Sequence, residues 1–271
     1  MNPTSLYSLA ALTAAAASAR WNWWRPLARG LPVLMYHKIG DPPPSSKLKP
    51  LWVDAEEFRW QMRALLRHGY TPMLFSELAA CEEGTRPSPA KPVLVTFDDG
   101  YANNAEIAFP ILRGLGIKAN IFLVVETIGS HNAWHDPESE PWQRMLDWKL
   151  ILEMQSSGLV EFGSHTMRHR NLLALSSEEI RWEAAESKKR LEERLGREVL
   201  AFAYPYGAGA YCERTRADAR AAGYRYDFGI RQGMCDWPWS AEQGPMRRLY
   251  IRGDGTRFDF HLNLTRGKAR F

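Results

Sequence analysis

The feature that most constrains the fold is a short, mostly apolar run, Val93–Phe97, that ends at two adjacent carboxylates, Asp98 and Asp99. A continuous run of this kind is typical of a parallel strand that is buried on both faces. Two neighbouring carboxylates repel each other, so such a pair usually keeps a proton or shares a cation. The pattern therefore predicts a buried parallel strand whose carboxyl end carries an active site with a bound cation.

Strand-like and helix-like segments alternate along the chain. The expected strands cover 31–39, 93–97, 119–125, 159–164, 201–205, 224–229 and 247–252, and the expected helices cover 54–68, 104–115, 148–158, 176–195, 213–222 and a piece from about 258. This alternation indicates an α/β fold with a parallel sheet, and chemical groups gathered at strand ends favour a closed barrel. Residues 72–78 are expected to form a short strand and a turn, and residues 129–142 a polar loop over the mouth of the site.

The chain of 271 residues is long enough for one large α/β domain. We expect an N-terminal tail, residues 1–30, followed by a single domain, residues 31–271. Residues 8–19 are alanine-rich and have no preceding Lys or Arg, which argues against a secretory signal, and they are too few to span a bilayer. The aromatic and basic residues 20–26 suit a membrane interface, and packing against the barrel is an equal alternative.

Charge and cysteine content narrow the expected partners and compartment. The net charge is only +4, and no block of basic residues with interleaved aromatics suggests nucleic acid as a partner. Cys81, Cys212 and Cys235 are odd in number and lack CxxC spacing, so we expect free thiols and a reducing compartment. We expect a cytoplasmic monomer with peripheral contact to the inner membrane through its N-terminus. A periplasmic or secreted location is the less favoured alternative.

His165 and His169 are the expected partners of the carboxylate pair. They are four residues apart, so both imidazoles would lie on one face if the segment were helical. With one carboxylate they offer two nitrogens and one oxygen and leave positions open for water and substrate, which is typical of a catalytic metal site. An isolated pair with this spacing more often consists of surface histidines. The carboxylate pair in the same chain makes a metal site the favoured interpretation.

Three short segments resemble the motifs of one family. Residues 96–100 (Thr-Phe-Asp-Asp-Gly), 163–169 (Gly-Ser-His-Thr-Met-Arg-His) and 202–207 (Phe-Ala-Tyr-Pro-Tyr-Gly) are similar in order and spacing to the first three motifs of polysaccharide deacetylases, the NodB-homology domain or carbohydrate esterase family 4. The surroundings of His37 resemble the poly-N-acetylglucosamine deacetylase branch, in which the late-motif histidine comes early. The resemblance covers roughly residues 31–230 and implies a distorted (β/α) barrel with its active site at the carboxyl ends of parallel strands.

The resemblance implies that Asp98 is the general base and that Asp99, His165 and His169 bind one divalent ion. The chemistry of these residue types is consistent with that division. A divalent cation polarises a carbonyl group and lowers the pKa of bound water towards about 7, and a carboxylate beside it can accept the proton of that water. Zinc is the expected ion, with cobalt, nickel or manganese as alternatives, because a His₂Asp set also accepts these.

An oxyanion donor and a general acid complete the expected site. The resemblance points to the backbone N–H of Tyr206, in a Pro-Tyr-Gly turn, as the donor. His37 is the expected acid, because a departing amine must be protonated and this residue lies at the end of the first expected strand, where catalytic groups usually collect. His261, in a helical segment near the C-terminus, is the alternative acid, and a purely structural role is the alternative for His37.

The chain departs from the family pattern at two places. The third motif commonly carries an arginine that orients the catalytic aspartate, and Ala203 stands there instead. The fourth motif is matched only weakly, by Asp236–Trp237. We therefore expect Asp98 to be supported from elsewhere in the chain. Asp147–Trp148 could place an aromatic wall beside a sugar, and core packing is an equal alternative for that tryptophan.

We predict a metal-dependent hydrolase of cell-envelope carbohydrate that removes N-acetyl groups from an amino sugar. The substrate is expected to be an N-acetylglucosamine polymer or a lipid-linked sugar precursor. Cleavage of O-acetyl esters on a carbohydrate is the alternative activity. A catalytically inactive carbohydrate-binding domain is disfavoured because the carboxylates and histidines are intact, and a phosphoesterase is disfavoured because no further Asp/His cluster supplies a second metal.

Overall fold

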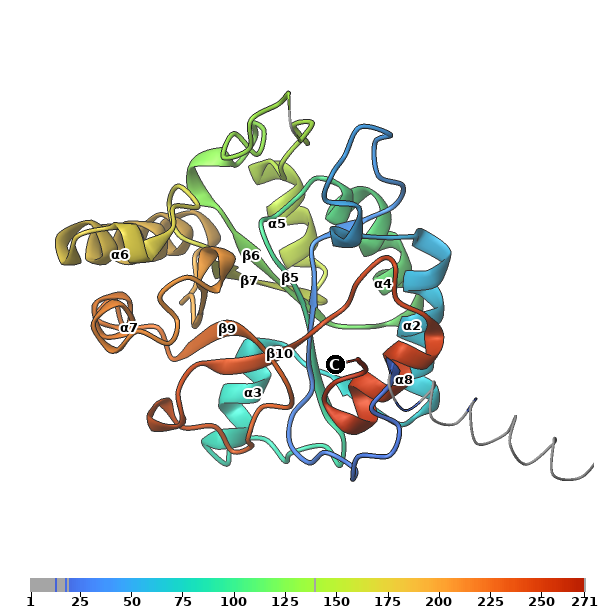
Figure 1. Cartoon of the computed structure of the whole chain (residues 1–271). Coiled ribbons are helices and arrows are strands. Elements are labelled where there is room, and N and C mark those ends of the chain that lie inside the picture. Colours follow the sequence, from blue (N-terminus) through green and yellow to red (C-terminus); the bar gives the residue numbers. More distant parts are fainter. Residues whose placement is uncertain (1–12, 14–17, 19, 139, 271) are drawn as a thin grey trace, which may run out of the picture.

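The computed structural model describes residues 13, 18, 20–138 and 140–270. Within this part of the chain, seven parallel strands close into a barrel (Figure 1). In order around the ring they are β1 (Val33–Tyr36), β10 (Met246–Tyr250), β9 (Tyr226–Gln232), β8 (Ala201–Ala203), β7 (Val160–Ser164), β6 (Ala119–Leu123) and β5 (Pro92–Phe97), which pairs with β1 again. The predicted parallel barrel is therefore confirmed.

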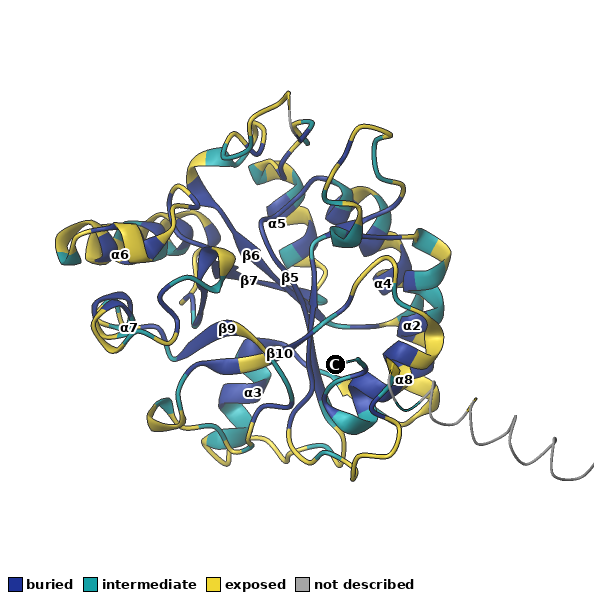
Figure 2. Ribbon diagram, in the orientation of Figure 1, coloured by how far each residue is buried: buried dark blue, intermediate teal, exposed yellow. Residues whose placement is uncertain are grey.

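Short strands and a ring of helices complete the fold. β4 (Thr71–Pro72) pairs with the start of β5, and β2 (Lys38–Ile39) pairs with β3 (Trp52–Val53). The helices are α2 (Ala55–Arg67), α3 (Phe75–Glu82), α4 (Phe109–Leu115), α5 (Trp148–Ser156), α6 (Ser177–Leu195), α7 (Glu213–Arg220) and α8 (Arg257–Arg266). The strands at the centre are buried almost throughout, whereas the helices keep one exposed side (Figure 2).

Local signals in the sequence fix the ends of several helices. The Asp54 carboxylate accepts the N–H groups of Glu56 and Glu57, both at 2.9 Å, and so begins α2 as the sequence predicts. Gly116 and Gly196 end α4 and α6 in the left-handed conformation that glycine adopts without steric cost. These caps explain why the observed bounds lie close to the predicted ones.

The segment around α3 is where the predicted secondary structure is wrong. A strand and turn were expected over residues 72–78, but a helix starts at Phe75 because the Glu77 carboxylate accepts the N–H of Leu74 at 3.1 Å. Ser76 donates to the Glu161 carboxylate at the start of β7, and the Phe75 ring lies 5.4 Å from that of Phe122 inside the barrel. The helix therefore closes the amino-terminal end of the barrel.

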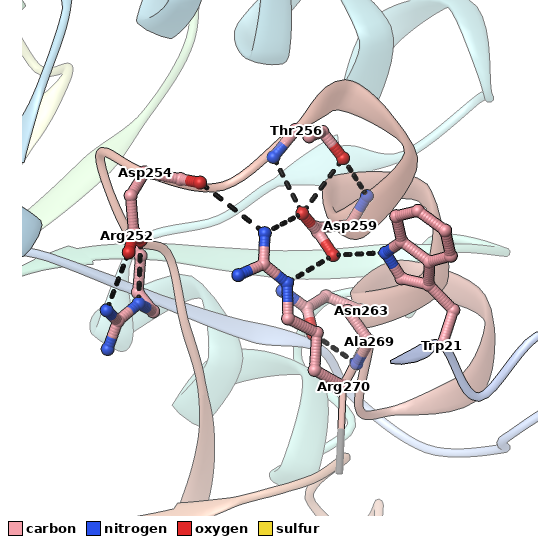
Figure 3. A network of polar contacts seen from close by, with 8 residues as sticks. All are labelled: Trp21, Arg252, Asp254, Thr256, Asp259, Asn263, Ala269 and Arg270. Carbon is pink, nitrogen blue, oxygen red and sulfur yellow. Dashed lines mark hydrogen bonds and ion pairs between the residues drawn. The ribbon is translucent and has the colours of Figure 1, made fainter. Parts of the chain in front are cut away.

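The first and last described segments meet at Asp259 in α8 (Figure 3). Its carboxylate accepts hydrogen bonds from Trp21 Nε1 and Arg270 Nε, both at 2.9 Å, and from the N–H and hydroxyl of Thr256. Burial alone would raise the pKa of Asp259, but these donors bring that pKa below its usual range. The boundary expected between residues 30 and 31 stays a prediction, and most of the alanine-rich run 8–19 lies outside the described residues. No helix in the described part of the chain has the length and apolar character needed to cross a membrane.

We expect Asp259→Asn to lower the free energy of unfolding by about 2 kcal/mol, because the new amide group would face N–H donors that now bind a charged acceptor. Urea denaturation of the two proteins measures this difference. Asp41→Asn, the same change at an exposed position, should stay within about 0.5 kcal/mol of the parent chain. Equal losses in the two variants would contradict a specific role for Asp259.

Candidate active site

A cavity of about 360 Å³ opens at the carboxyl ends of the strands. Asp98 and Asp99 enter it directly after β5, and His165 enters it after β7. The cavity is lined by all the residues that the sequence analysis placed in the main site, namely His37, Asp98, Asp99, His165, His169 and Tyr206. The structure thus brings these side chains together, while their individual roles stay predictions.

Asp99, His165 and His169 converge on one buried point. Asp99 Oδ1 lies 3.3 Å from His165 Nε2 and 3.2 Å from His169 Nε2, and the potential ligand atoms of the three residues all lie within 4.8 Å of one another. His165 Nδ1 lies 2.8 Å from the carbonyl oxygen of Ala203, so this nitrogen donates there and leaves the Nε2 lone pair facing the shared point. Two nitrogens and one carboxylate in this arrangement could hold a metal ion.

The electrostatics of Asp99 fit a cation at the same point. Burial would raise the pKa of this carboxyl, but its contacts with the imidazoles of His165 and His169 hold the pKa well below its ordinary value. The carboxylate is therefore charged, and it needs positive compensation inside a pocket that excludes most water. A divalent cation bound by the three residues would provide that compensation.

The segment His165–His169 is not the helical turn that its spacing suggested. Two of its residues, Thr166 and His169, have positive φ angles of 72° and 57°, which are unfavourable for residues with a Cβ atom. Glu183 of α6 accepts two backbone N–H groups of this segment, at 2.8 and 3.0 Å, and holds it in place. The imidazoles therefore converge because a strained loop is anchored to α6.

Asp98 is held by an arginine that the sequence analysis did not identify. Nη1 and Nη2 of Arg248, in β10, donate to the two carboxylate oxygens of Asp98 at 2.6 and 2.8 Å, and Nε donates to the carbonyl of Gly229. Burial would raise the pKa of Asp98, but the Arg248 guanidinium keeps the pKa below its usual range. This arginine supplies the support that Ala203 cannot give. In β10 it alternates with Met246 and Tyr250, a pattern that could have marked it as facing inward.

His37 is the histidine that faces Asp98. Its Nε2 lies 4.0 Å from Asp98 Oδ2, and its Nδ1 is buried with no hydrogen-bond partner among the described residues. Burial lowers the pKa of His37, and the neighbouring carboxylate of Asp98 opposes that effect. His261, the alternative acid, lies on the exposed side of α8, where its ring is 6.1 Å from that of His68, and it does not line the cavity.

Two loops form the walls of the cavity. Trp134, in the loop predicted to cover the mouth, stacks on His169 with ring centroids 4.3 Å apart. The aromatic wall therefore comes from this tryptophan. Trp148 instead packs against the core beneath Arg194, and Asp147 caps the start of α5.

Glu140 connects the two loops. Its buried carboxylate accepts a hydrogen bond from the Ser46 hydroxyl at 2.7 Å and another from the N–H of Lys47 at 2.8 Å. Leu48 and Leu51, which follow in the same loop, line the cavity together with Trp134. This cross-link fixes the positions of both walls.

Tyr206 lies at the rim of the cavity, where its ring meets that of His169 edge-on at 4.6 Å. Its backbone has φ 57° and ψ 7°, so the turn is strained at this residue. Gly207 follows at φ 66°, and a Cβ atom there would lie 2.3 Å from the Ile230 side chain. The turn is therefore tightly constrained. Whether its N–H faces an oxyanion stays a prediction.

Comparison with known proteins identifies the family. The family model for polysaccharide deacetylases matches residues 85–226. The chain is 31% identical to the Bacillus subtilis protein YxkH over 79% of this chain and 68% of that protein. YxkH is named as a polysaccharide deacetylase. The chain is also 28% identical to the poly-β-1,6-N-acetyl-D-glucosamine N-deacetylase of Escherichia coli K12 over 51% of this chain, a match that spans only 20% of the E. coli protein.

A solved structure extends the similarity to three dimensions. A Bacillus anthracis protein described as a polysaccharide deacetylase superposes with a TM-score of 0.74 and 28% identity, over 87% of this chain and 69% of that chain. The superposition takes in a larger share of the chain than the segment matched by the family model. The chain described here therefore belongs to the polysaccharide deacetylase family.

Proposed function

We propose that the protein is a metal-dependent hydrolase that removes N-acetyl groups from an amino sugar. The observation that carries the proposal is the division between the adjacent carboxylates. Asp99 meets two histidines at one point, whereas Asp98 is turned to Arg248 and stays beside that point. This division supports a cation-binding role for Asp99 and a proton-exchanging role for Asp98.

Asp99, His165 and His169 would hold the ion, and zinc is the ion that this ligand set suits best, with cobalt, nickel or manganese as alternatives. When bound, a divalent ion supplies polarisation of the acetyl carbonyl and a water molecule of lowered pKa. Asp98 would accept the proton of the attacking water, because Arg248 keeps its carboxylate ionised and oriented. Such proton transfer typically contributes a factor of about 10²–10⁴ to the rate.

His37 and Tyr206 would stabilise the other two groups that become charged in the reaction, the departing amine and the oxyanion. His37 lies within 4.0 Å of Asp98 and would protonate the departing amine. The backbone N–H of Tyr206 would stabilise the oxyanion. An ester has a better leaving group than an amide and needs such an acid less, so a histidine at this position favours N-acetyl over O-acetyl substrates. O-acetyl carbohydrate esters remain the alternative substrates.

The family and the relatives support the proposed substrate class. The E. coli relative is named for poly-β-1,6-N-acetyl-D-glucosamine, which supports an N-acetylglucosamine polymer as the substrate. A lipid-linked amino sugar would present the same acetamido group. The aromatic rings of Trp134 and Tyr206 flank His169 and would contact the sugar ring.

Acetate release from N-acetylglucosamine oligomers tests the proposal. We expect release that disappears on chelation and returns with zinc, and a loss of about 10²-fold or more in Asp98→Asn with zinc binding retained. Asp41→Asn, at an exposed position, is the matched control and should be fully active. If the protein binds zinc and releases acetate from acetyl esters but from no amino sugar, the proposed activity is wrong and the esterase alternative is correct.

Arg248 is expected to act by positioning Asp98. Arg248→Gln should lower the free energy of unfolding, because Asp98 loses its buried partner. In the folded variant kcat should fall at least tenfold with zinc affinity and KM little changed, because the metal ligands are untouched and the base loses its orientation. Arg248→Lys should recover part of kcat, since it restores the charge but not the two parallel hydrogen bonds. Arg247→Gln, on the exposed neighbour, is the control. A parallel loss of zinc affinity and kcat would indicate general damage to the barrel instead.

Glu183 is expected to support the metal ligands through the backbone of their loop. Glu183→Ala should weaken zinc binding about tenfold or more, as measured by competition with a chelating dye, because the strained loop loses both anchoring bonds. Glu183→Gln keeps an acceptor oxygen and should lose less. Glu178→Ala, at an exposed position of the same helix, should bind zinc like the parent chain. Unchanged affinity in Glu183→Ala would show that the loop holds its shape without this residue.

A further inference from the structure

Apart from the catalytic cavity, an arginine-rich surface lies on the side of the barrel where α2 and α8 run side by side (Figure 1). Arg59, Arg63 and Arg67 recur every four residues along α2 and therefore share one side of that helix. Arg257, the first residue of α8, lies over the ring of Trp60 at 4.6 Å. We call this surface, together with the N-terminal segment packed on α8, the α2–α8 face. A groove along it shares none of its lining residues with the catalytic cavity.

The α2–α8 face carries uncompensated positive charge. Arg59 is paired with Glu56 at 3.4 Å, and Arg257 is paired with Glu57 at 3.1 Å. No carboxylate of the described residues lies within ion-pair distance of Arg63 or Arg67, and both side chains are exposed. A partner with negative charge would therefore gain the most at these two arginines.

Exposed apolar side chains lie among and beside these arginines. Leu66 is 41% exposed between Arg63 and Arg67, and Phe258 is 45% exposed beside Arg257. A soluble anionic polymer would leave such side chains in water, whereas a bilayer can bury them below its headgroups.

The N-terminal segment adds two more aromatic rings at the α8 end. Trp21 is fixed there by its hydrogen bond to Asp259 (Figure 3). Its ring also makes an edge contact with Phe258, with ring centroids 5.6 Å apart. Trp23 and Trp24, two and three residues further on, are 43% and 53% exposed. Tryptophan is the residue most typical of the boundary between headgroups and acyl chains.

We infer that the α2–α8 face docks the protein on a bilayer containing anionic phospholipid. The arginines would bind the phosphates, and the leucine, phenylalanine and tryptophans would enter the interface, a combination typical of peripheral membrane surfaces. Because the catalytic cavity lies at the strand ends and shares no lining residue with the groove, docking would leave that cavity accessible. This inference goes beyond the proposed deacetylation and does not depend on it.

Sedimentation of the full chain with lipid vesicles tests the inference. We expect binding to vesicles of phosphatidylcholine with phosphatidylglycerol, weaker binding to phosphatidylcholine alone, and a decrease with salt. The double variant Arg63→Gln/Arg67→Gln should bind the anionic vesicles about 25-fold more weakly, at about fivefold per arginine. Lys189→Gln/Arg194→Gln removes the same charge from exposed positions of α6 and should bind like the parent chain. Equal binding by the two double variants, or no preference for anionic vesicles, would overturn the inference.

A second pair of variants separates a bilayer from a soluble polyanion. Leu66→Ser/Phe258→Ser keeps every arginine, so it should weaken vesicle binding but leave binding to heparin, used as a polyanion probe, unchanged. If this variant binds vesicles normally and heparin competes fully, the face is a polyanion site and the lipid assignment is wrong. Thermal melting of each variant checks that the barrel is intact.

Discussion

The active site depends on the buried ion pair between Arg248 and Asp98. Removing either charge would leave the other in a pocket that water barely reaches, which is among the most destabilising changes a core can suffer. The pair also sets the chemistry, because a carboxylate held by two guanidinium hydrogen bonds is ionised and cannot rotate towards the ligands of a cation. Stability and function therefore rest on the same contact, and the geometry of Asp98 cannot relax without cost.

Around this pair, the barrel collects strained backbone at one end. Asp99, Thr166, His169 and Tyr206 are the non-glycine residues of the described chain with positive φ, and all lie at or beside the cavity. Such conformations persist only where neighbours enforce them. Here the enforcing contacts come from the surrounding helices and loops, among them the carboxylate of Glu183 beneath the histidine loop. Among the described residues, none at the opposite end, closed by α3, combines a Cβ atom with a positive φ.

Much of the fold and part of the site could be predicted from the sequence, because the signals were local. A few neighbouring residues specify the strand before Asp98 and the caps at Asp54 and Gly196. The alternation of strands and helices is the sum of such local signals. What could not be predicted depends on distant residues. Arg248 is 150 positions from Asp98, and nothing near either residue specifies the pairing. The two histidines do meet at one point with Asp99, but not through the helical turn that their spacing suggested, because contacts with α6 hold their loop in a different shape.

The order of the strands has a consequence for how the protein reaches this state. β1 lies between β5 and β10, so the first strand of the barrel completes its pairing only when the last strand arrives. Contacts between such distant segments form late, because closing a long loop costs entropy before any contact forms. Arg248 lies in that last strand. A nascent chain would therefore carry Asp98 without its counter-charge until β10 is in place, and barrel closure would complete the electrostatics of the active site in the same event.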